Sequence, residues 1–275
     1  MIGICQTAFA QIRPEPKHSV ELISQLVLGE WVRILRIEFD WCEIETEHGY
    51  RGFTRINQLS LVLKTEAFNT ISGGIWISTK AGKDSRFPNS IYQLSPGKFQ
   101  YQENQAYSQN SISDEFGWKE ISNPVEFKTS LLDEICTSYQ GIPYVWGGKT
   151  SNGLDCSGLV QCIFQQLGFS FPRDAWQQAE IGETIEFDKT IPDFEPGDLL
   201  FFQRPGKKIH HVAISNGGHL YFHASEWTRQ NSLNPQNELF VQDRFDTLVS
   251  AKRISQKNLT KLKDSFISLI QKDLE

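Results

Sequence analysis

The sequence predicts an α+β protein in which one or two small β-barrels precede a domain of helices packed on a sheet. Short apolar alternations broken by turn residues fill residues 1–63, which is typical of small barrels. From about residue 126, apolar residues at helical spacing alternate with short apolar strands. A length of 275 residues suits two or three modest domains. We expect domains over residues 1–63, 64–125 and 126–275.

The composition excludes several classes of protein. Hydrophobic residues make up 39% and charged residues 22% of the chain, the balance of a soluble globular protein rather than a disordered one. The net charge is -6 and no run of Lys and Arg forms a basic stripe, so we expect no nucleic-acid partner. No apolar stretch approaches the roughly 18 residues of a membrane-spanning helix.

The N-terminus contains the tripeptide Ala-Phe-Ala, which imitates a signal-peptidase site. The apolar run before it is shorter than the usual h-region of about 7 to 15 residues, and no Lys or Arg precedes it. We therefore interpret this segment as mature sequence and expect a cytoplasmic protein. The five cysteines are odd in number and scattered, without CxxC spacing, so neither a disulfide framework nor a cysteine-rich zinc site is expected.

The first segment reads as several short strands. Breaks fall at Phe39-Asp40 and at His48-Gly49, and so many strands in a small span favour a closed barrel. The stretches GGIWISTKAG, SIYQLSPGKFQYQ and FGWKEIS in residues 64–125 read as further β-structure. The apolar alternation that predicts strands in residues 1–63 consists of Val32, Ile34, Leu35 and Ile37, followed by Trp41, Ile44 and Tyr50.

The third segment mixes helices and strands. The stretch SLLDEICTSYQG predicts a helix that ends at Gly141, and a second helix begins at Cys156. Strands are predicted at DLLFF, HVAIS, LYFHAS and ELFVQDRF. The tail LTKLKDSFISLIQKDLE has helical spacing, and we expect it to dock on the body rather than bind a partner.

Cys156 is the candidate nucleophile. Asp155 suits the N-cap of its helix, and Gly168 suits the stop. At about 100° per residue, Val160 and Ile163 share the direction of the thiol, so the thiol leads the apolar face and points at the sheet which that face covers. A buried cysteine that only fills space in the hydrophobic core fits the same pattern. A first-turn position, however, predicts a lowered thiol pKa, because the helix dipole favours the thiolate.

A hairpin supplies candidate bases for this thiol. Asn216-Gly217-Gly218 separates two strands, and a three-residue loop places Ser215 opposite His219 and His211 opposite His223. Opposed residues have Cβ atoms about 4.5–5.5 Å apart, within reach of an imidazole–imidazole hydrogen bond. A two-residue turn pairs His211 with Phe222 instead.

Two alternatives stay open for these histidines. His210 competes with His211 for the base role, and the three-residue loop favours His211, with His219 a solvated strand end. Four histidines so close together also raise a zinc site, but no neighbouring Cys, Asp or Glu completes a tetrahedral set. We expect no metal and no cofactor.

The motifs YVWGG…LDCSGLV, FPRDAWQQ, EPGDLLFF, HVAI and FHAS resemble, in order and spacing, the NlpC-type cysteine peptidases. These are papain-like hydrolases that cut bacterial peptidoglycan stem peptides. The resemblance spans about 130–250 and implies helices on an antiparallel sheet. It also implies Cys156 as nucleophile, His211 as base and His223 as the residue that orients the base.

The first segment resembles a bacterial SH3-like domain in Arg13-Pro14, Gly29, Trp41 and GYRGF, although Phe53 stands where that family usually has Trp. Related enzymes often carry two such barrels, so residues 64–125 are expected to form a second, degenerate one. The resemblance further implies that one barrel walls off the cleft, so that only peptides with a free N-terminal L-Ala fit.

The resemblance also implies substrate-binding residues. Tyr144 is implied to hold the substrate or the oxyanion, although an ordinary core aromatic fits its pattern too. Asp155 and Ser157 are implied to contact the amino end of the substrate, and a buried carboxylate suits an ammonium group. Tyr50 is a candidate contact from the barrel wall. Some relatives have Ser where Ala175 stands, so one hydroxyl contact is missing here.

The predicted function is hydrolysis of the γ-D-glutamyl–diamino acid bond of muropeptides, with peptidoglycan-derived peptides as the partners. Two rival functions remain. An amidase or a transglutaminase-like enzyme keeps the triad and differs in its pocket. A cell-wall-binding protein keeps the barrels and loses the thiol or the histidines, but this chain has all three. The sequence does not indicate the preferred diamino acid or the oligomeric state.

Overall fold

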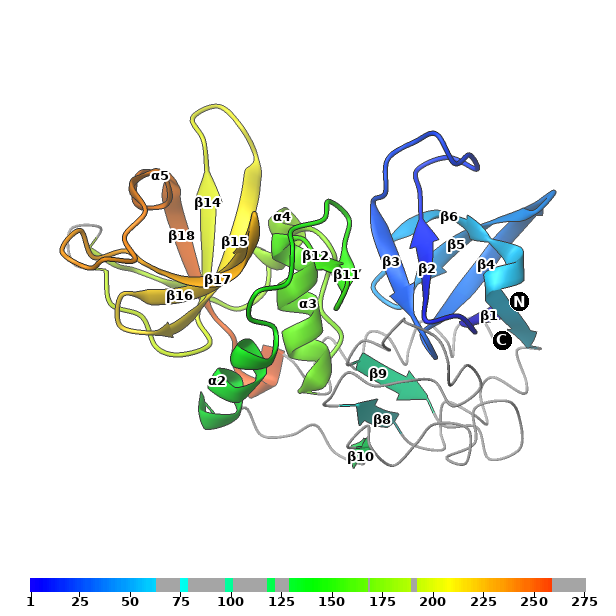
Figure 1. The fold of residues 1–275 in the computed structure, drawn as a ribbon, viewed down its shortest axis with the longest axis horizontal. Coiled ribbons are helices and arrows are strands. Elements are labelled where there is room, and N and C mark those ends of the chain that lie inside the picture. The colour runs from blue at the N-terminus through cyan, green and yellow to red at the C-terminus, as the bar shows by residue number, and fades with distance from the viewer. Residues whose placement is uncertain are drawn as a thin grey trace.

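The computed structural model begins with a strand-rich unit and ends with a helix-and-sheet unit (Figure 1). The predicted helix stop at Gly168, most of the predicted second barrel and the predicted helix in the tail lie outside the described residues. The structure describes residues 1–62, 75–78, 97–100, 118–121, 129–167, 169–188 and 192–258.

The first unit contains a five-stranded antiparallel sheet in the order β6-β5-β4-β1-β7 and a β2-β3 hairpin. An isolated bridge between Arg13 and Phe53 joins the end of β2 to β6, which curves the unit around an apolar core. Its likeness to an SH3 domain stays a prediction. The elements are β1 (Ile2–Cys5), β2 (Phe9–Ile12), β3 (Ser24–Val27), β4 (Trp31–Glu38), β5 (Trp41–Thr46), β6 (Arg51–Arg55), the 3-10 helix η1 (Ile56–Gln58) and β7 (Leu59–Val62). This unit is called the barrel below.

Both predicted breaks in the barrel are turns. Glu38 pairs with Trp41, so Phe39 and Asp40 form a two-residue hairpin turn, in which Phe39 has a φ of 53°. The second turn contains Gly49 at a φ of 76°, a conformation that glycine adopts without steric cost. This second turn brings Tyr50 to the start of β6.

Three strands of the middle segment are described: β8 (Ile75–Ser78), β9 (Gly97–Gln100) and β10 (Trp118–Ile121). They form one antiparallel sheet in the order β10-β8-β9. The prediction of β-structure in the three quoted stretches is therefore confirmed. A second barrel over residues 64–125 stays a prediction.

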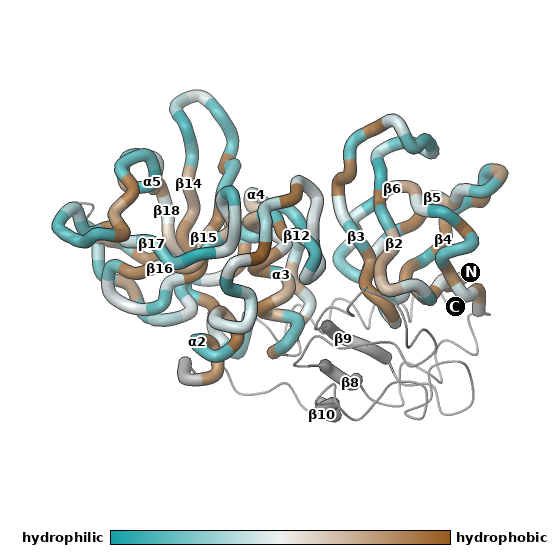
Figure 2. The backbone as a smooth tube through the Cα atoms, in the orientation of Figure 1, coloured by the Kyte–Doolittle hydropathy of each residue, from teal (hydrophilic) through white to brown (hydrophobic). Residues whose placement is uncertain are grey.

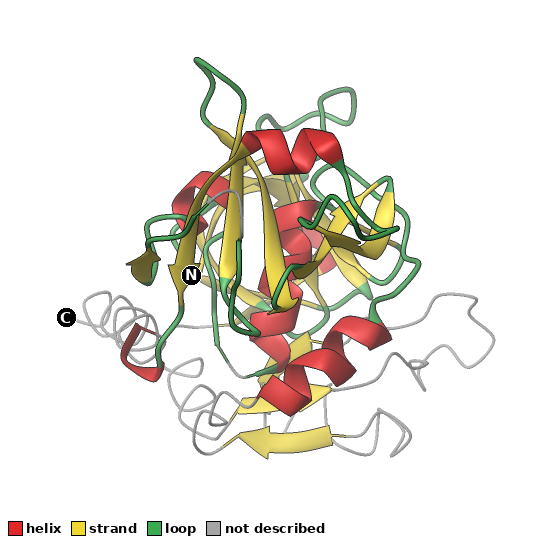
Figure 3. Cartoon of the chain, turned by 90° about the vertical axis from the view of Figure 1, so that its left-hand side faces the viewer, coloured by secondary structure: helices red, strands yellow, loops and turns green. Residues whose placement is uncertain are grey.

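The last unit is built on a six-stranded antiparallel sheet in the order β13-β18-β14-β15-β16-β17. Figure 3 views the molecule from the side of this sheet, with α3 running behind the strands. The helices are α2 (Thr129–Ser138), α3 (Cys156–Gln166), α4 (Ala175–Gln178) and α5 (Gln242–Thr247); the strands are β11 (Lys149–Thr150), β12 (Gly153–Leu154), β13 (Glu183–Ile185), β14 (Leu199–Gln203), β15 (Ile209–Gly217), β16 (Leu220–Ser225), β17 (Trp227–Ser232) and β18 (Leu248–Arg253).

Alternate residues of this sheet belong to two separate hydrophobic clusters, because successive side chains of a strand point to opposite faces. One cluster packs against α3, and the other lies on the opposite face. Figure 2 shows hydrophobic stretches along these strands and a hydrophilic β14–β15 loop. The sheet residues of the α3 cluster are Leu199, Phe201, Val212, Ile214, Phe222 and Ala224; those of the opposite cluster include Leu200, Phe202, Ala213 and Tyr221.

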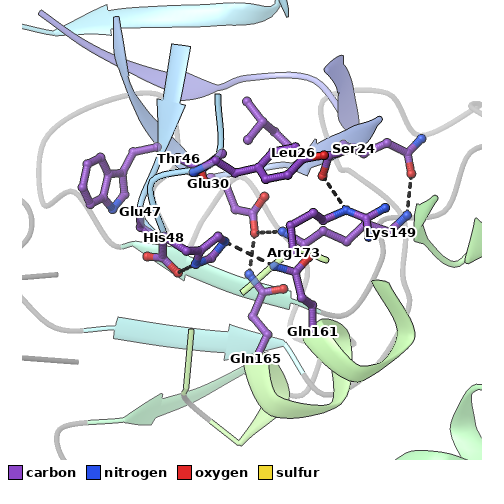
Figure 4. A pocket seen from close by; sticks show the side chains of 14 residues that line it. Ser24, Leu26, Glu30, Thr46, Glu47, His48, Lys149, Gln161, Gln165 and Arg173 are labelled. Carbon is purple, nitrogen blue, oxygen red and sulfur yellow. Dashed lines mark hydrogen bonds and ion pairs between the residues drawn. The ribbon is translucent and has the colours of Figure 1, made fainter. Parts of the chain in front are cut away.

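Helix α3 is buried on its polar side as well as on its apolar side. Its apolar side covers the sheet, and its glutamines meet the barrel: Gln165 Nε2 donates to Glu30 Oε1 at 2.5 Å, and Gln161 Nε2 lies 3.3 Å from His48 Nε2. Lys149 adds an ion pair to Glu30 at 2.5 Å. Figure 4 shows this polar contact around a cavity of about 20 Å³, too small to hold a peptide. The barrel is thus fixed against the helix that carries Cys156.

One predicted strand is wrong. The stretch ELFVQDRF forms a turn followed by α5, not a strand. Asn237 stabilises the turn, because its side chain accepts a hydrogen bond from the N–H of Leu239 at 2.9 Å. The helix that follows places Arg244 over the ring of Phe202, on the sheet face away from α3.

Candidate active site

A cleft of about 660 Å³ lies where the barrel meets the last unit. Cys156 and His211 both line it, together with Tyr50 of the barrel. The structure therefore brings the predicted nucleophile and base to one solvent-filled space. Tyr144, Asp155 and Ser157, predicted from the resemblance, also line the cleft, whereas His223 lies behind His211 and is 1% exposed.

Cys156 is the first residue of α3, as predicted. The Asp155 side chain caps the helix by accepting the N–H of Gly158 at 2.7 Å. The Cys156 sulfur accepts hydrogen bonds from the main-chain N–H groups of Val212 and Ser157. The first of these bonds holds the thiol against β15, one residue from His211.

The predicted lowering of the thiol pKa is wrong. Burial raises the pKa of Cys156 to about 12, with a smaller raising effect from the charge of Asp155. The two N–H groups and the charge of Arg173 lower the pKa, but they do not outweigh burial. The free protein therefore holds a neutral thiol, which must lose its proton to a neighbouring base before it can attack.

The predicted register of the histidine hairpin is also wrong. Ser215 pairs with Tyr221 rather than with His219, a shift of two residues. Gly217 pairs with Leu220, so the loop consists of Gly218 and His219, and a bulge falls at Asn216. Because side chains alternate with a period of two, this shift leaves His211 and His223 on the same face of the sheet.

His211 and His223 nevertheless meet. Pairing between β15 and β16 stops at Ile214 and Phe222, although both strands continue toward the cleft. His211 Nε2 lies 2.8 Å from His223 Nδ1, and the two rings are nearly perpendicular at 84°. The thiol reaches β15 at Val212, beyond the last pair of this ladder.

The histidine pair lies on the face of the sheet opposite to the one that α3 covers. His211 packs against Phe202, and His223 against Tyr221, both members of the opposite cluster. The thiol and the imidazole therefore approach each other from two faces of the sheet. They share one cleft because the pairing of β15 with β16 ends beside them.

A chain of hydrogen bonds fixes the tautomer of both histidines. Asn231 Nδ2 donates to the carbonyl of Leu239 at 3.0 Å, and Arg229 Nε donates to Asn231 Oδ1 at 3.2 Å. Arginine only donates and a carbonyl only accepts, so the assignment of the amide oxygen and nitrogen follows. That oxygen lies 2.8 Å from His223 Nε2 and can only accept, so His223 donates a hydrogen bond from a protonated Nε2.

It follows that neutral His223 carries its proton on Nε2 and accepts through Nδ1. His211 must then donate from Nε2, which leaves the lone pair on its Nδ1 free. This is the form that a general base needs. Burial lowers the pKa of His211 well below its ordinary value and that of His223 to about 3, so both rings are neutral near pH 7.

The Asp155 carboxylate is already saturated by the protein. Arg173 binds it through two N–H groups, at 2.5 and 3.0 Å, and the N–H of Gly147 donates at 2.9 Å. The hydroxyl of Ser157 and the N–H of Gly158 complete its contacts. Arg173 itself is 3% exposed, and the pair joins the loop before α4 to the start of α3. Asp155 is thus built into the scaffold beneath Cys156.

A second carboxylate of the cleft is less fully bound. Asp174 lines the cleft beside Arg173 and accepts hydrogen bonds from the side chain of Trp176 and from the Tyr50 hydroxyl of the barrel. Burial raises the pKa of Asp174, and burial raises that of Tyr50 to about 12. Ala175, next in the chain, also lines the cleft and supplies no hydroxyl.

The remaining predicted residues differ in exposure. Tyr144 is partly buried, and burial followed by the charge of Cys156 raises its pKa. His210 is exposed and lines the cleft, whereas His219 lies near the loop and contacts the carbonyl of Pro192. Among the residues whose positions are described, no three His, Cys, Asp or Glu side chains are grouped to hold a metal ion.

Residues 141–250 match the NlpC/P60 family. The chain contains an NlpC/P60 domain. This domain, with its thiol and paired histidines, is that of a cysteine peptidase. The predicted resemblance to this family is confirmed, and the roles assigned to Cys156, His211 and His223 stay predictions.

Two curated relatives place the NlpC/P60 domain among named peptidases. Dipeptidyl-peptidase 6 of Lysinibacillus sphaericus is 27% identical over 283 residues, covering 91% of this chain and 98% of the relative. The gamma-D-glutamyl-L-lysine dipeptidyl-peptidase of Bacillus subtilis is 39% identical over 106 residues, covering 37% of this chain and 34% of the relative. The chain thus spans nearly all of one relative and aligns with about a third of the other.

A solved structure shows the same fold over almost the whole chain. The crystal structure of an NlpC/P60 family protein from Bacillus cereus superposes with a TM-score of 0.75 at 17% identity. The likeness covers 94% of this chain and 100% of that one. Among the described residues, no helix has the length and apolarity to cross a membrane.

Sequence reasoning missed three contributors to the site of the NlpC/P60 domain. Asn231 and Arg229 lie on β17, a strand that the apolar pattern did not reveal because it is mostly polar. Arg244 lies on α5, which was predicted as a strand. The only sequence signal for the first two is their spacing of two, which places them on one face of a strand.

Proposed function

We propose that this protein is a cysteine endopeptidase that hydrolyses the γ-D-glutamyl–diamino acid bond of peptidoglycan stem peptides with a free N-terminal L-Ala. The observation that carries the proposal is the closure of the cleft by the barrel beside the thiol. Tyr50, Glu21 and Ile23 of the barrel line the same cleft as Cys156. The name of the Bacillus subtilis relative supports this choice of bond.

The chemistry begins with a proton transfer. His211 Nδ1 takes the proton of Cys156, and the sulfur attacks the γ-carbonyl carbon of the D-glutamyl residue. Main-chain N–H groups at the start of α3, including that of Cys156, stabilise the oxyanion. As the C–N bond breaks, His211 returns the proton to the leaving amine, and a thioester remains on Cys156.

Water completes the cycle. His211 removes a proton from a water molecule that attacks the thioester, and the released sulfur recovers the proton. His223 accepts the Nε2–H of His211 and stabilises the imidazolium that forms in each half-reaction. Burial opposes a lasting positive charge on His211, so the proton is passed on readily.

We assign the substrate ammonium to Asp174 and Tyr50 rather than to Asp155. The five donors bound to Asp155 leave its carboxylate little capacity, and Arg173 balances its charge. Asp174 faces the cleft with the Tyr50 hydroxyl from the opposing barrel. A carboxylate and a phenol at a walled end suit a small, unblocked amino terminus.

The same wall supports free peptides as substrates in place of the intact cell wall. In the wall, the amine of L-Ala is acylated by the glycan-bound lactyl group, so it carries no charge and continues into a sugar. Tyr50 and Ile23 line the barrel side of the cleft, where a sugar attached to L-Ala would have to pass. A cytoplasmic location agrees with free peptides and stays a prediction.

The test is product analysis by mass spectrometry. We expect the purified protein to release L-Ala-γ-D-Glu from L-Ala-γ-D-Glu-L-Lys, and the Cys156→Ala variant to release none. An N-acetylated tripeptide should react at least about 100-fold more slowly, since a lost charged contact costs about 1.5–3 kcal/mol and the acetyl group also clashes. Release of ammonia or a transferred acyl group, without the dipeptide, supports the amidase or transglutaminase-like rival; binding without any turnover supports the cell-wall-binding rival.

A further inference from the structure

We propose that the Arg244 guanidinium, together with the Ser225 hydroxyl, binds a carboxylate of the residue that leaves when the peptide is cut. The inference rests on the proposed function and deepens it, because it names the group that recognises the leaving side of the substrate. Of the two arginines that the described residues contribute to the cleft, Arg173 has all three side-chain nitrogens bound to other residues, and Arg244 does not.

The two ends of the cleft carry different groups. Tyr50 of the barrel and Asp174, the N-cap of α4, lie at one end, and Ser225 at the end of β16 and Arg244 of α5 lie at the other. In Figure 1 the barrel and α5 lie on opposite sides of α3 and α4. A bound peptide that crosses Cys156 therefore runs from the barrel toward α5.

The chemistry of the reaction fixes the direction of that peptide. His211 must deliver a proton to the leaving nitrogen, so the leaving residue lies on the His211 side of the thiol. Arg244 lies over the ring of Phe202, which packs against His211, whereas Arg173 binds Asp155, which caps the helix that begins at Cys156. Arg173 thus marks the acyl side, and Arg244 marks the leaving side.

Several N–H donors of the Arg244 guanidinium are not used in hydrogen bonds to the part of the protein that the structure describes. Its Nη2 donates to Ser225 Oγ at 3.3 Å, and its Nη1 lies 3.2 Å from Asp243, whose side chain is 52% exposed. These two contacts use two of its five N–H donors. Arg173, by contrast, commits all three of its nitrogens to Asp155, Ser157 and Ser24.

The position of Arg244 also suits a carboxylate. Its side chain is 15% exposed, and the guanidinium carbon lies 5.8 Å from the centre of the Phe202 ring, which restricts its orientation. A planar guanidinium held in this way makes two parallel hydrogen bonds to a carboxylate, and partial burial strengthens them. The adjacent Ser225 hydroxyl adds a third donor to the same group.

Two carboxylates of the leaving residue have this chemistry. One is the α-carboxylate, which is free in a tripeptide and amide-linked in a tetrapeptide. The other is the side-chain carboxylate of diaminopimelate, which lysine lacks. Both are acids on the residue whose amine is released, so a set of four substrates separates them.

The experiment compares kcat/KM for L-Ala-γ-D-Glu-L-Lys and its α-carboxamide, and for the same pair with meso-diaminopimelate. We expect the free lysine acid to exceed its amide by about 10- to 100-fold, the value of a charged hydrogen-bonded contact. In Arg244→Gln this ratio should fall to about 1, and Arg244→Lys should give an intermediate ratio. If only the diaminopimelate peptides keep a high kcat/KM after amidation, the side-chain carboxylate is the group bound.

Arg204→Gln is the matched control. Arg204 is 64% exposed and also lies near Asp243, at 3.7 Å, but does not line the cleft. This variant should keep the wild-type ratio. If Arg244→Gln leaves unchanged both the acid-to-amide ratios and the preference for diaminopimelate over lysine, the inference is overturned. Wild-type ratios of 1 for both pairs, with no preference for diaminopimelate, overturn it without any variant. Failure of the wild type to cut any of the four peptides overturns the proposed function instead.

Discussion

His211 Nε2 lies 2.8 Å from His223 Nδ1, although the two residues are not paired across their strands. The bond forms where the β15–β16 ladder has ended, and it is continued by Asn231 and Arg229 on β17. The ring nitrogen of His211 that keeps a free lone pair is thus determined by an amide and a guanidinium on a strand two places away in the sheet. This arrangement leads to the following expectations.

Replacement of His223 should slow the reaction because it removes Nδ1, the atom that accepts a hydrogen bond from His211. His223→Leu removes the acceptor for the Nε2–H of His211, and we expect kcat/KM on the tripeptide to fall by about 100-fold or more. His223→Gln keeps a carbonyl oxygen that can accept this proton, so its loss should be at least about tenfold smaller. Steady-state kinetics, with circular dichroism to check folding, measure both; equal losses contradict the acceptor role.

Asn231 should influence the reaction without touching the substrate. Asn231→Leu leaves the Nε2–H of His223 without its acceptor, and we expect kcat/KM to fall about 10-fold. Asn231→Asp places a negative charge there, which raises the pKa of His223 and moves the acid limb of the pH–rate profile upward. Nitrogen NMR of the imidazoles reports the tautomers, and an unchanged tautomer in Asn231→Leu contradicts the relay.

The resting thiol should react slowly with iodoacetamide. Because burial raises the pKa of Cys156 to about 12, the thiolate fraction rises with pH throughout the accessible range. The alkylation rate of the Cys156 peptide, followed by mass spectrometry, should increase about tenfold per unit between pH 6 and pH 9. A rate that stays level over this interval indicates a pre-formed thiolate–imidazolium pair and contradicts the neutral state.

Removing one partner of the buried Arg173–Asp155 pair should lower stability strongly. Arg173→Met leaves the buried Asp155 carboxylate without its cation, and the free energy of unfolding should fall by about 3–5 kcal/mol. Lys17→Met, which breaks the exposed pair with Glu15, should change it by less than about 1 kcal/mol. Urea unfolding measures both values, and a loss of similar size in the two variants contradicts the distinction.

Stability should fall as the solution is acidified below pH 6.5. The pKa of His223 is about 3 in the folded protein and ordinarily 6.5, so between these values the unfolded chain binds more protons. Its contribution is complete above pH 6.5 and is lost as pH falls, by up to about 1.4 kcal/mol per unit. His211, whose pKa is also lowered, acts in the same direction.

The matched measurement is the slope of the unfolding free energy between pH 6.5 and pH 5. His223→Gln should reduce this slope, since one buried neutral histidine is gone, whatever its effect on the absolute stability. His18→Gln, at a histidine in the barrel, serves as the control. The same slope in the wild type and in His223→Gln contradicts the assignment.

Much of the site was predictable because it depends on local patterns. The apolar spacing after Cys156 and the capping Asp155 define α3 within one stretch of chain, so the helix start was correctly placed. The prediction that His211 and His223 lie on one face of the sheet is correct although the predicted register is wrong. The register error was two residues, and side chains on a strand return to the same face every two residues. An error of one residue would have separated them.

Other features were not predictable because they depend on partners far apart in the chain. The thiol pKa was expected to fall from the helix dipole, but burial between the sheet and the barrel raises it. No sequence pattern indicated that Arg173, 18 residues later, binds the Asp155 carboxylate, whereas contact of Asp155 with a substrate ammonium stays a prediction. The stretch with Arg244 was expected to be a strand, and a turn stabilised by Asn237 makes it a helix.

The sequence by itself determined which chemistry this chain carries: a cysteine at a helix start and two histidines on neighbouring strands, because those positions follow from short-range periodicity. Only the tertiary structure decided how the groups are charged, which nitrogen is the base and which side of the cleft is closed. Those properties depend on burial and on contacts between segments more than a hundred residues apart, such as Glu30 with Lys149 and Gln165. Local spacing carries no information about such distances.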